Sequence, residues 1–457
     1  MDIIPLEIWQ KIVDSLDIKT QIIFRSLCRA CYQGIRIQNF LCVPTFKKLN
    51  DNTIKQYPYI KYFDASYNGQ ITNVNFLKNL VSLNASSSYS IFCHCGIDNE
   101  GISKCINLKE LDINHNEKIT KINHLLKLEK LNISNNSVSD ISKLINLTEL
   151  TMTDNNHIRH LSHLPNLKRL VMRGFAFIDD LEKCTNLTEL DISDNKYTEL
   201  AKLPMLRKLV AKRARVLTDN ELQYFDNLIE LDIESNPNIT KIGHLSKLQK
   251  LNLNNCSKIK NEELENCTNL RELELANNTS IQNINHLTKL QYLNISGTSS
   301  VMSCTGFLKC TNITHLILDQ NPNVRNINHL TKLEILSAAW LSMLSNKGIS
   351  NCSNLISLDI GWNSKISNLN HLTNLRILSI QGQYCGVSDE SIKKCVNLRY
   401  LNISSNSKII NLNHLPLLEE LIADYSYGIS DQTISDCKKL KYITCYGNNK
   451  VSKKSNA

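Results

Sequence analysis

Cysteine and histidine are the residues of this chain whose types and spacing could support metal, redox or nucleophilic chemistry. Seven cysteines each lie three residues before the first leucine of a recurring motif, and seven histidines each lie four residues before that leucine in other copies. The cysteines are Cys105, Cys184, Cys267, Cys310, Cys352, Cys395 and Cys437. The histidines are His124, His163, His244, His286, His329, His371 and His414. Their chemistry depends on whether the repeat brings them together.

The repeat spacing argues against metal sites and disulfides made from these side chains. In a parallel ladder at about 4.8 Å per strand, equivalent residues two repeats apart lie roughly 10 Å from one another. A disulfide needs Cα atoms within about 7 Å, and zinc ligands must converge on one ion. We therefore predict that the cysteines are small buried hydrophobes in a reducing compartment and that the histidines are structural. No cofactor is expected.

Other chemical motifs are weak. Cys93-His94-Cys95, near Cys105, is too closely spaced to reach one ion, so we interpret it as part of an insertion. Cys28 and Cys31 lie in a predicted helix, which is not typical of a redox motif. The sequence contains no glycine-rich phosphate loop, nucleophile elbow or convergent carboxylate pair. We therefore predict that the chain is not an enzyme.

The element that positions these residues is a motif of leucine, two residues, leucine, one residue, and leucine or isoleucine, often followed by asparagine. Nineteen copies run from Ile60 to Asn448 in the 457 residues. From Leu187 onward, steps of 19 or 20 residues alternate with steps of 22 or 23 between first leucines. A fixed period of this kind indicates a solenoid, because a single repeat cannot bury its apolar residues alone.

Each repeat alternates apolar and polar residues around its second leucine, which predicts a short strand. We expect the strands to pair in parallel along the inner face of an arc, and the asparagine to satisfy backbone groups in the turn that follows. Thr218–Glu221 matches a capping box, so we expect short helices on the outer face of the long repeats. The short repeats should have 3₁₀ or extended segments there.

The pattern resembles the leucine-rich repeat family, and the cysteine-bearing long repeats resemble its cysteine-containing subclass. The resemblance implies an α/β fold, a leucine-rich repeat solenoid with a curved parallel sheet on its concave face and a small helical module at the N-terminus. We place the module at residues 1–45, the solenoid at 46–450 and a basic tail at 451–457. An insertion at residues 86–104 interrupts the rhythm.

The first forty residues differ from the repeats. Apolar residues recur at helical spacing between Ile8 and Leu16, and Pro5 lies where a helix can begin. With its Pro-Leu-Glu start, Leu-Asp-Ile step and Leu-Cys-Arg segment, the stretch resembles an F-box. It departs from that family at Cys31, where tryptophan is usual, although Tyr32 follows. A helical cap that shields the end of the solenoid is the alternative interpretation.

The F-box resemblance implies binding to a Skp-family adaptor and, through it, to a cullin–RING ubiquitin ligase. The residues expected to contact the adaptor are Pro5, Leu6, Ile8, Trp9, Ile12, Leu16, Ile18 and Leu27. The repeats would then bind the protein to be ubiquitinated. The alternative function is a ubiquitin-independent interaction scaffold.

The residues two, four and six positions after each first leucine should face solvent on the inner side. From Glu110 to Glu272 the first of these positions alternates in charge, which indicates a structural ladder. After that it becomes apolar and aromatic, and such a patch is costly unless a partner covers it. Rings that pack against each other or a terminal segment are the alternative. The predicted target-binding residues are Tyr292, Ile317, Ile335, Trp340, Trp362, Ile377, Tyr400, Tyr425 and Tyr442.

Charge and hydropathy constrain partners and location. A net charge of +9 with both signs interspersed does not argue for nucleic acid, which is not an expected partner. We expect no membrane partner and no secretory signal, and therefore an intracellular protein of the cytoplasm or nucleus. The composition also looks similar to repeat proteins of amoebae or their large DNA viruses, which would imply the host cytoplasm. One basic patch could hold an acidic tail or be a solvated edge; it comprises Arg169, Arg173, Arg207, Lys208, Lys212, Arg213 and Arg215.

Overall fold

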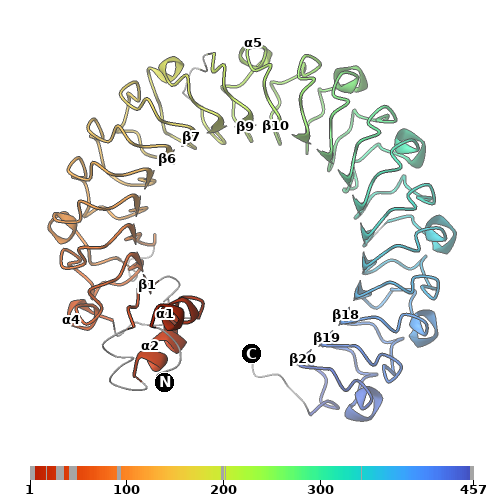
Figure 1. The fold of residues 1–457 in the computed structure, drawn as a ribbon. Coiled ribbons are helices and arrows are strands. Elements are labelled where there is room, and N and C mark those ends of the chain that lie inside the picture. Colours follow the sequence, from red (N-terminus) through yellow and green to blue (C-terminus); the bar gives the residue numbers. More distant parts are fainter. Residues whose placement is uncertain are drawn as a thin grey trace. The chain divides into compact units, whose positions relative to one another are not determined.

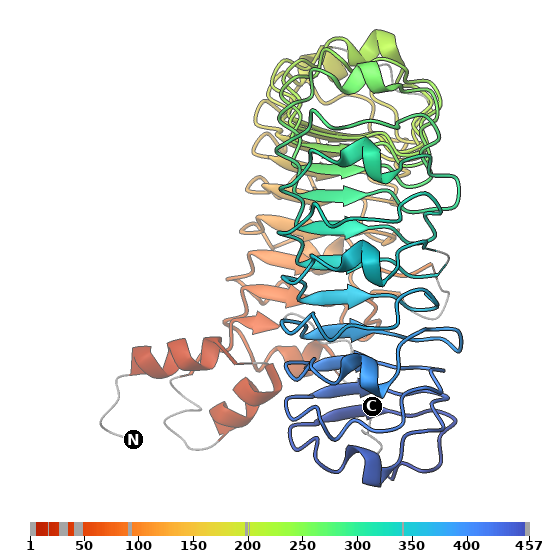
Figure 2. The same cartoon turned by 90° about the vertical axis from the view of Figure 1, so that its right-hand side faces the viewer.

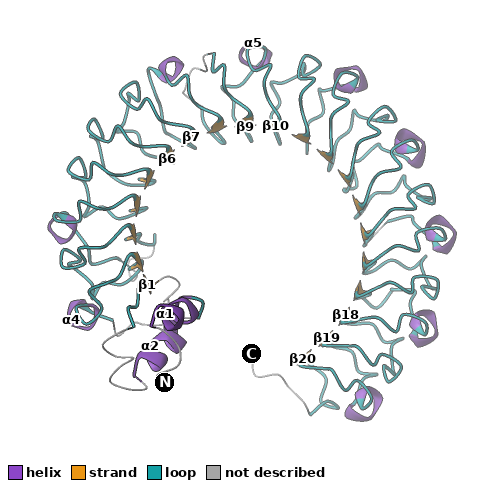
Figure 3. Cartoon of the chain, viewed as in Figure 1, coloured by secondary structure: helices purple, strands orange, loops and turns teal. Residues whose placement is uncertain are grey.

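A computed structural model describes residues 6–16, 18–26, 35–40, 49–89, 94–196, 200, 202–340 and 342–452. The chain divides into two compact units, residues 1–217 and 218–457, here called the N-terminal and C-terminal units. Within each unit, short strands lie on one side of the coil and short helices on the other (Figures 1 and 3). The strands β2–β20 correspond to the nineteen predicted repeats, which confirms the leucine-rich repeat solenoid.

The N-terminal unit begins with two helices, α1 (Leu6–Asp14) and α2 (Ile18–Ser26). Trp9 packs on Phe24 with ring centroids 5.3 Å apart, beside the buried Val13 and Ile35. The parallel sheet starts with β1 (Asn39–Phe40), one strand earlier than the repeat count predicts, because β1 pairs with β2. The remaining strands are β2 (Tyr62–Asp64), β3 (Ser82–Asn84), β4 (Glu110–Asp112), β5 (Lys130–Asn132), β6 (Glu149–Thr151), β7 (Arg169–Val171), β8 (Glu189–Asp191) and β9 (Lys208–Val210). The outer turns carry α4 (Asp51–Ile54), η1 (Glu100–Ile102) and η2 (Leu181–Lys183).

The C-terminal unit is a regular stack in which each strand pairs in parallel with the next (Figure 2). Its strands are β10 (Glu230–Asp232), β11 (Lys250–Asn252), β12 (Glu272–Glu274), β13 (Tyr292–Asn294), β14 (His315–Ile317), β15 (Ile335–Ser337), β16 (Ser357–Asp359), β17 (Ile377–Ser379), β18 (Tyr400–Asn402), β19 (Glu420–Ile422) and β20 (Tyr442–Thr444). Its helices are α5 (Asp219–Leu222), η3 (Asn261–Leu264), η4 (Cys304–Phe307), η5 (Asn346–Ile349), η6 (Asp389–Ile392) and η7 (Asp431–Ile434).

The leucine motif forms the core. In the repeat that starts at Leu355, the residues Leu355, Leu358 and Ile360 are no more than 1% exposed. Their counterparts in the next repeat are equally buried and lie beside them, because Leu358 pairs with Leu378 in the sheet. The apolar residues of each repeat are therefore covered by its neighbours, as the period predicts.

The outer face departs from the expectation in the type of helix. The long repeats of the C-terminal unit carry single 3₁₀ turns, and α5 is the one α-helical turn described there. Thr218 caps α5 in a capping box with Glu221, as its sequence predicts. From Leu228 onward, the described part of the 20-residue steps contains turns and no helix. Like α5, these 3₁₀ turns span four residues, a length at which 3₁₀ geometry is common.

Most of the asparagines that follow the strands are buried and satisfy backbone groups of the neighbouring repeat, which confirms their predicted role. The Nδ2 of Asn321 donates to the carbonyl of Ile295 at 2.7 Å in the preceding repeat. Its Oδ1 accepts from the amide of Asn323 at 2.8 Å in its own turn. Ser426 occupies the same place in a later repeat and donates to the carbonyl of Ile403 at 2.7 Å.

The cysteine row is buried and unpaired in disulfides. All twelve cysteines within the described residues are free. Burial raises the pKa of the Cys105 thiol to about 11 and, with nearby carboxylates, that of Cys184 to about 12. Both thiols therefore remain protonated near neutral pH, which suits packing rather than reactivity.

The histidine row has the predicted structural role. The Nε2–H of His286 donates to the carbonyl of Leu264 at 2.8 Å, one repeat earlier, and His371 does the same to Ile349 at 3.1 Å. A carbonyl can only accept, so the bond fixes the tautomer. At His329 and His414 the buried Nε2 forms no hydrogen bond with any described residue, and burial lowers the pKa of both.

Replacing Asn321 with alanine should destabilise the C-terminal unit by roughly 2–4 kcal/mol, because it leaves buried backbone groups unpaired. Asn321→Ser should cost less, since serine in this row keeps one donor, as Ser426 does. The exposed Asn326→Ala is the control and should shift stability by less than about 0.5 kcal/mol. Urea unfolding followed by circular dichroism measures all three. Equal midpoints for Asn321→Ala and Asn326→Ala would contradict the role assigned to this row.

Acidification should destabilise the C-terminal unit because His329 and His414 must stay neutral in the folded repeats. Burial lowers the pKa of both, so below a pH of about 6.5 the unfolded chain binds more protons than the folded chain. Stability should therefore be full above about pH 7 and fall as the pH drops toward 5.5. The double substitution of His329 and His414 by glutamine should reduce this fall in urea midpoint. The exposed His157→Gln control should keep the wild-type pH dependence.

Candidate functional site

On the inward face of the C-terminal unit, apolar or aromatic side chains occupy the first position of several strands, interrupted by Ser357 and Glu420. The register places Ile335 beside Ser357, Ser357 beside Ile377, and Ile377 beside Tyr400. Ile335 is 39% exposed and Ile377 is 45% exposed, although both lie on a strand. The predicted target-binding residues of this row are therefore brought together and face solvent.

A second aromatic row follows the strands, in the turn seven residues after each first leucine. Trp340, Trp362 and Tyr425 have φ angles of 62°, 64° and 56° there. Most other repeats also have positive φ at this place, and several use residues that tolerate it, such as Asn277 and Gly382. A bulky aromatic side chain in the left-handed region is uncommon, so the surrounding structure must hold it.

Contacts between neighbouring repeats hold the tryptophans in place. The amide of Trp340 donates to the carbonyl of Gly361 at 2.6 Å, and the amide of Trp362 donates to that of Gln381 at 2.8 Å. The two indoles stack with centroids 5.4 Å apart and planes 8° apart. A Cβ added to Gly382 would lie 2.5 Å from Trp362 Cδ2, so glycine there makes room for the ring.

The rings thus pack on one another, one of the alternatives drawn from the sequence, yet they are not turned into the core. Trp340 remains 48% exposed and Tyr425 also 48%. Tyr384, which was not among the predicted residues, extends the stack with its ring 6.2 Å from that of Trp362. Tyr446 lies 5.5 Å from Tyr425 in an edge-on arrangement. The result is a half-exposed aromatic strip along the turns.

The other predicted target-binding residues have different surroundings. The Tyr292 hydroxyl donates to Glu274 Oε1 at 2.7 Å, and burial together with this carboxylate raises the pKa of the phenol. Burial also raises the pKa of Tyr400. Ile317 is half-buried, whereas Tyr442 is 62% exposed. Tyr292 is therefore part of a polar network at one end of the row.

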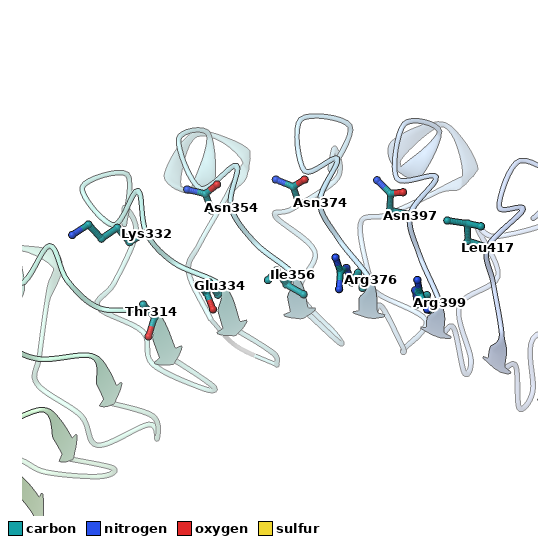
Figure 4. A pocket seen from close by; sticks show the side chains of 10 residues that line it. All are labelled: Thr314, Lys332, Glu334, Asn354, Ile356, Asn374, Arg376, Asn397, Arg399 and Leu417. Atoms are coloured by element: carbon teal, nitrogen blue, oxygen red, sulfur yellow. The ribbon is translucent and has the colours of Figure 1, made fainter.

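A groove of about 530 Å³ lies beside the N-terminal ends of the same strands (Figure 4). The sequence analysis did not predict it. In four repeats, a lysine just before the first leucine donates to the asparagine of the preceding repeat, as Lys332 does to Asn312 Oδ1 at 2.7 Å. Asn374 replaces that lysine, and in the described chain no lysine donates to Asn354. The groove is lined by Thr314, Lys332, Glu334, Asn354, Ile356, Asn374, Arg376, Asn397, Arg399 and Leu417.

The N-terminal unit presents a charged face instead. Lys130 forms an ion pair with Glu149 at 2.9 Å, and Arg169 pairs with Glu189 at 3.3 Å, as the predicted ladder requires. Within the basic patch, Arg173 forms a salt bridge with Asp191, and Arg213 donates to both carboxylate oxygens of Asp194 at 2.8 and 2.9 Å. Except for the buried Asp191 these charges are exposed, and all of them are paired, so the exposed pairs contribute little to stability or to anion binding.

The predicted adaptor-binding residues fall into three groups. Pro5 and Leu27 lie outside the described residues, and for Leu6, Ile8 and Ile18 only the helical backbone is described. Trp9 packs inside the module against Phe24, and Leu16 is half-buried. Ile12 is 40% exposed on α1, and Ile23 of α2, which the sequence did not single out, is 53% exposed. Among the side chains that the structure describes in this module, Ile12 and Ile23 are the exposed large apolar ones.

Metal-ligand clusters and membrane-spanning helices are absent from the described residues. No group of three or more histidine, cysteine or acidic side chains there is arranged to hold an ion. Cys93 lies outside the described residues, while His94 is exposed and Cys95 is buried. None of the described helices is long and apolar enough to cross a membrane.

Comparison with known proteins supports both parts of the chain. Residues 1–42 match the F-box domain. The solved structure of TLR13 in complex with ssRNA13 has a TM-score of 0.60 and 22% identity, covering 91% of this chain and 63% of that chain. The structure of an internalin (InlF) of Listeria monocytogenes has a TM-score of 0.45 and 22% sequence identity, covering 60% of this chain and 85% of that chain. The structure of an LRR protein of Leptospira interrogans has a TM-score of 0.44 and 21% sequence identity, covering 86% of this chain and 98% of that chain. No curated protein matches the chain.

The likeness to TLR13 shows the fold and not the ligand, because the identity is 22%. The chain spans less than two thirds of TLR13. The fold and the domain match together define a protein that joins an F-box domain to a leucine-rich repeat solenoid. Both parts are typical of proteins that bind other macromolecules.

Asn374→Lys should fill the groove without destabilising the fold. The new ammonium should donate to Asn354 Oδ1, as Lys332 donates to Asn312, so the urea midpoint should stay within about 0.5 kcal/mol of wild type. Asn374→Leu is the control that fills space without a donor. A crystal structure should show the lysine across the groove. A lysine side chain directed into solvent, with the groove still open, would contradict this explanation of its origin.

Proposed function

We propose that the chain is the substrate-recognition subunit of a cullin–RING ubiquitin ligase. The observation that carries the proposal is the union of an F-box domain at residues 1–42 with a repeat face that leaves large aromatic side chains exposed. The F-box binds a Skp-family adaptor, and the C-terminal unit binds the target protein. Ubiquitin transfer is the work of the partners, and the chain itself performs no bond chemistry.

The adaptor-binding end rests on the apolar surface of the two helices. Ile12 and Ile23 are exposed, whereas Val13 on the same helix as Ile12 is fully buried. Exposed apolar side chains on a small helical module are suited to a partner surface, because burial on binding removes them from water. Such a complex places the chain in the cytoplasm or nucleus.

The target-binding end rests on the strand face and the aromatic strip of the C-terminal unit. Tryptophan and tyrosine are enriched in the residues that dominate protein–protein binding energy. Trp340, Tyr425 and Tyr442 are each between 48% and 62% exposed, and they lie on regularly spaced repeats. The rigid strands beneath them hold these rings with little loss of conformational entropy on binding.

A ubiquitin-independent interaction scaffold is the second candidate, and it shares the repeat face while lacking the adaptor. A nucleic-acid role draws only on the likeness to TLR13, whose solved complex contains ssRNA. The strands β12–β20 carry no lysine or arginine, so this face lacks the positive charge that nucleic-acid binding requires.

Ile12→Glu should lower the affinity for a purified Skp-family adaptor by at least about tenfold, because it brings a charge to an apolar contact. Lys11→Ala, on the exposed side of the same helix, is the matched control and should leave the affinity unchanged. Trp9→Ala is unsuitable because it removes the packing on Phe24. Isothermal titration with the full chain measures the affinity, and circular dichroism verifies folding. Absence of adaptor binding by the wild-type chain would favour the scaffold.

A further inference from the structure

In the C-terminal unit, acidic side chains lie on and after the strands, whereas arginines lie before them. Between Glu272 and Thr444, the strand residues include no lysine or arginine, although the whole chain has a net charge of +9. The turns that follow those strands add Asp319 and Asp424, each one residue before the row of the tryptophans. On the opposite side, the groove contains Arg376 and Arg399. An acidic edge therefore coincides with the aromatic strip.

Two carboxylates lie beside the tryptophan pair without a basic counterpart. Asp319 accepts from the amide of Ala339, the neighbour of Trp340, at 2.8 Å. Asp359 accepts from the amide of Gly361, the neighbour of Trp362, at 2.9 Å. Within the described chain, no lysine or arginine forms an ion pair with either carboxylate. Burial and then the charge of Asp319 raise the pKa of Asp359. The site thus holds negative charge that no lysine or arginine of the described residues pairs with.

The indoles supply the second part of a cation site. A guanidinium stacks on the face of an indole through cation–π and planar contacts, and tryptophan is the most favourable partner. The parallel stack of Trp340 on Trp362 leaves Trp340 48% exposed, so an outer ring surface is accessible. A neighbouring carboxylate can accept the N–H groups of the same guanidinium.

We propose that this acidic aromatic edge docks an extended, arginine-bearing segment of the target protein. The proposal rests on the proposed target-binding role of the same face and names the chemistry of its partner. From the Trp340 repeat to the Tyr425 repeat is four strand spacings, or roughly 19 Å, which about six extended residues span. Arginine side chains stack on the tryptophan pair and reach Asp319 or Asp359. The apolar row of Ile335 and Ile377 contacts the side chains between them.

An acidic segment in the arginine groove is the competing occupant. The structure favours it less, because Arg399 already contacts Glu419 at 3.2 Å, and Glu419 is also bound by Lys441 at 2.9 Å. A second copy of the chain is the other possible occupant. The experiment below distinguishes the arginine-bearing segment from an acidic segment and from a second copy of the chain.

The experiment measures binding of labelled heptapeptides to the purified full chain by fluorescence anisotropy in 150 mM NaCl. The probe alternates arginine with serine; matched peptides carry citrulline or glutamate in place of arginine. We expect the citrulline peptide to bind at least about tenfold more weakly, since it keeps the shape and loses the charge. Equal binding of the arginine and citrulline peptides, or preference for the glutamate peptide, would overturn the proposal.

The variants must respect the left-handed backbone. Alanine is strained at positive φ, so the pair is Trp340→Asn with Trp362→Asn, because asparagine already occupies this place at Asn255 and Asn277. This double variant and the pair Asp319→Asn with Asp359→Asn should each weaken arginine-peptide binding about tenfold or more. Ser235→Asn, in the same row and outside the aromatic strip, is the control and should change it less than twofold.

Two further readouts separate the explanations. Adaptor affinity is measured on the same preparations, so loss of peptide binding with intact adaptor binding concerns this site alone. Absence of adaptor binding with intact peptide binding refutes the ligase role and leaves the arginine site standing. Peptide binding that is equal in the tryptophan variant and the control reflects general charge attraction and overturns the proposal. Self-association that disappears in the tryptophan variant identifies a second copy as the occupant and overturns it as well.

Discussion

Parallel pairing without a shift in register is the constraint on which the rest of this structure depends. Because Leu358 lies beside Leu378 and Ser357 beside Ile377, a residue's place in its repeat determines its neighbours in the next. The backbone is satisfied across the same boundary, since the Nδ2 of Asn406 donates to the carbonyl of Ile380 at 2.9 Å. Equivalent positions of successive repeats therefore form a row of side chains in similar surroundings. A binding surface on this fold is made of such rows.

The row after the strands shows how such an environment is used. Its positive φ suits glycine and asparagine, and the amide of each residue is held by a carbonyl of the next repeat. Tryptophan at Trp340 and Trp362 is therefore not explained by backbone preference. Stacking between the rings offsets part of the conformational cost, while their remaining exposure gains no burial energy. Residues held against local preference in this way are typical of binding sites.

Features that recur with the repeat period can be predicted from the sequence. Features that depend on a single residue that differs from the repeat pattern cannot. Strands, buried leucines and the asparagine row follow from the spacing alone, and α5 follows from the capping box at Thr218. Short helices on the outer face of the long repeats were predicted, but their 3₁₀ geometry was not, and such geometry is typical of very short helical segments. The groove lies where Asn374 and Leu417 occupy the position that carries lysine in Lys247, Lys289 and Lys332. The tryptophan stack lies beyond the strand, where alternation no longer gives side-chain direction.

The two sides of the strand face differ in a way that gives a bound segment an orientation. Lys332, Arg376 and Arg399 lie before the strands, and Asp319, Asp359 and Asp424 lie at or after their ends. The row before the strands is mixed in charge, because Glu334 and Glu419 lie among its arginines, so the proposed arginine-bearing segment is attracted toward the tryptophan side. Because the rows run across the strands, such a ligand lies perpendicular to them and contacts many repeats at once. Selectivity then comes from the order of its charges along several repeats, which a single pocket could not provide.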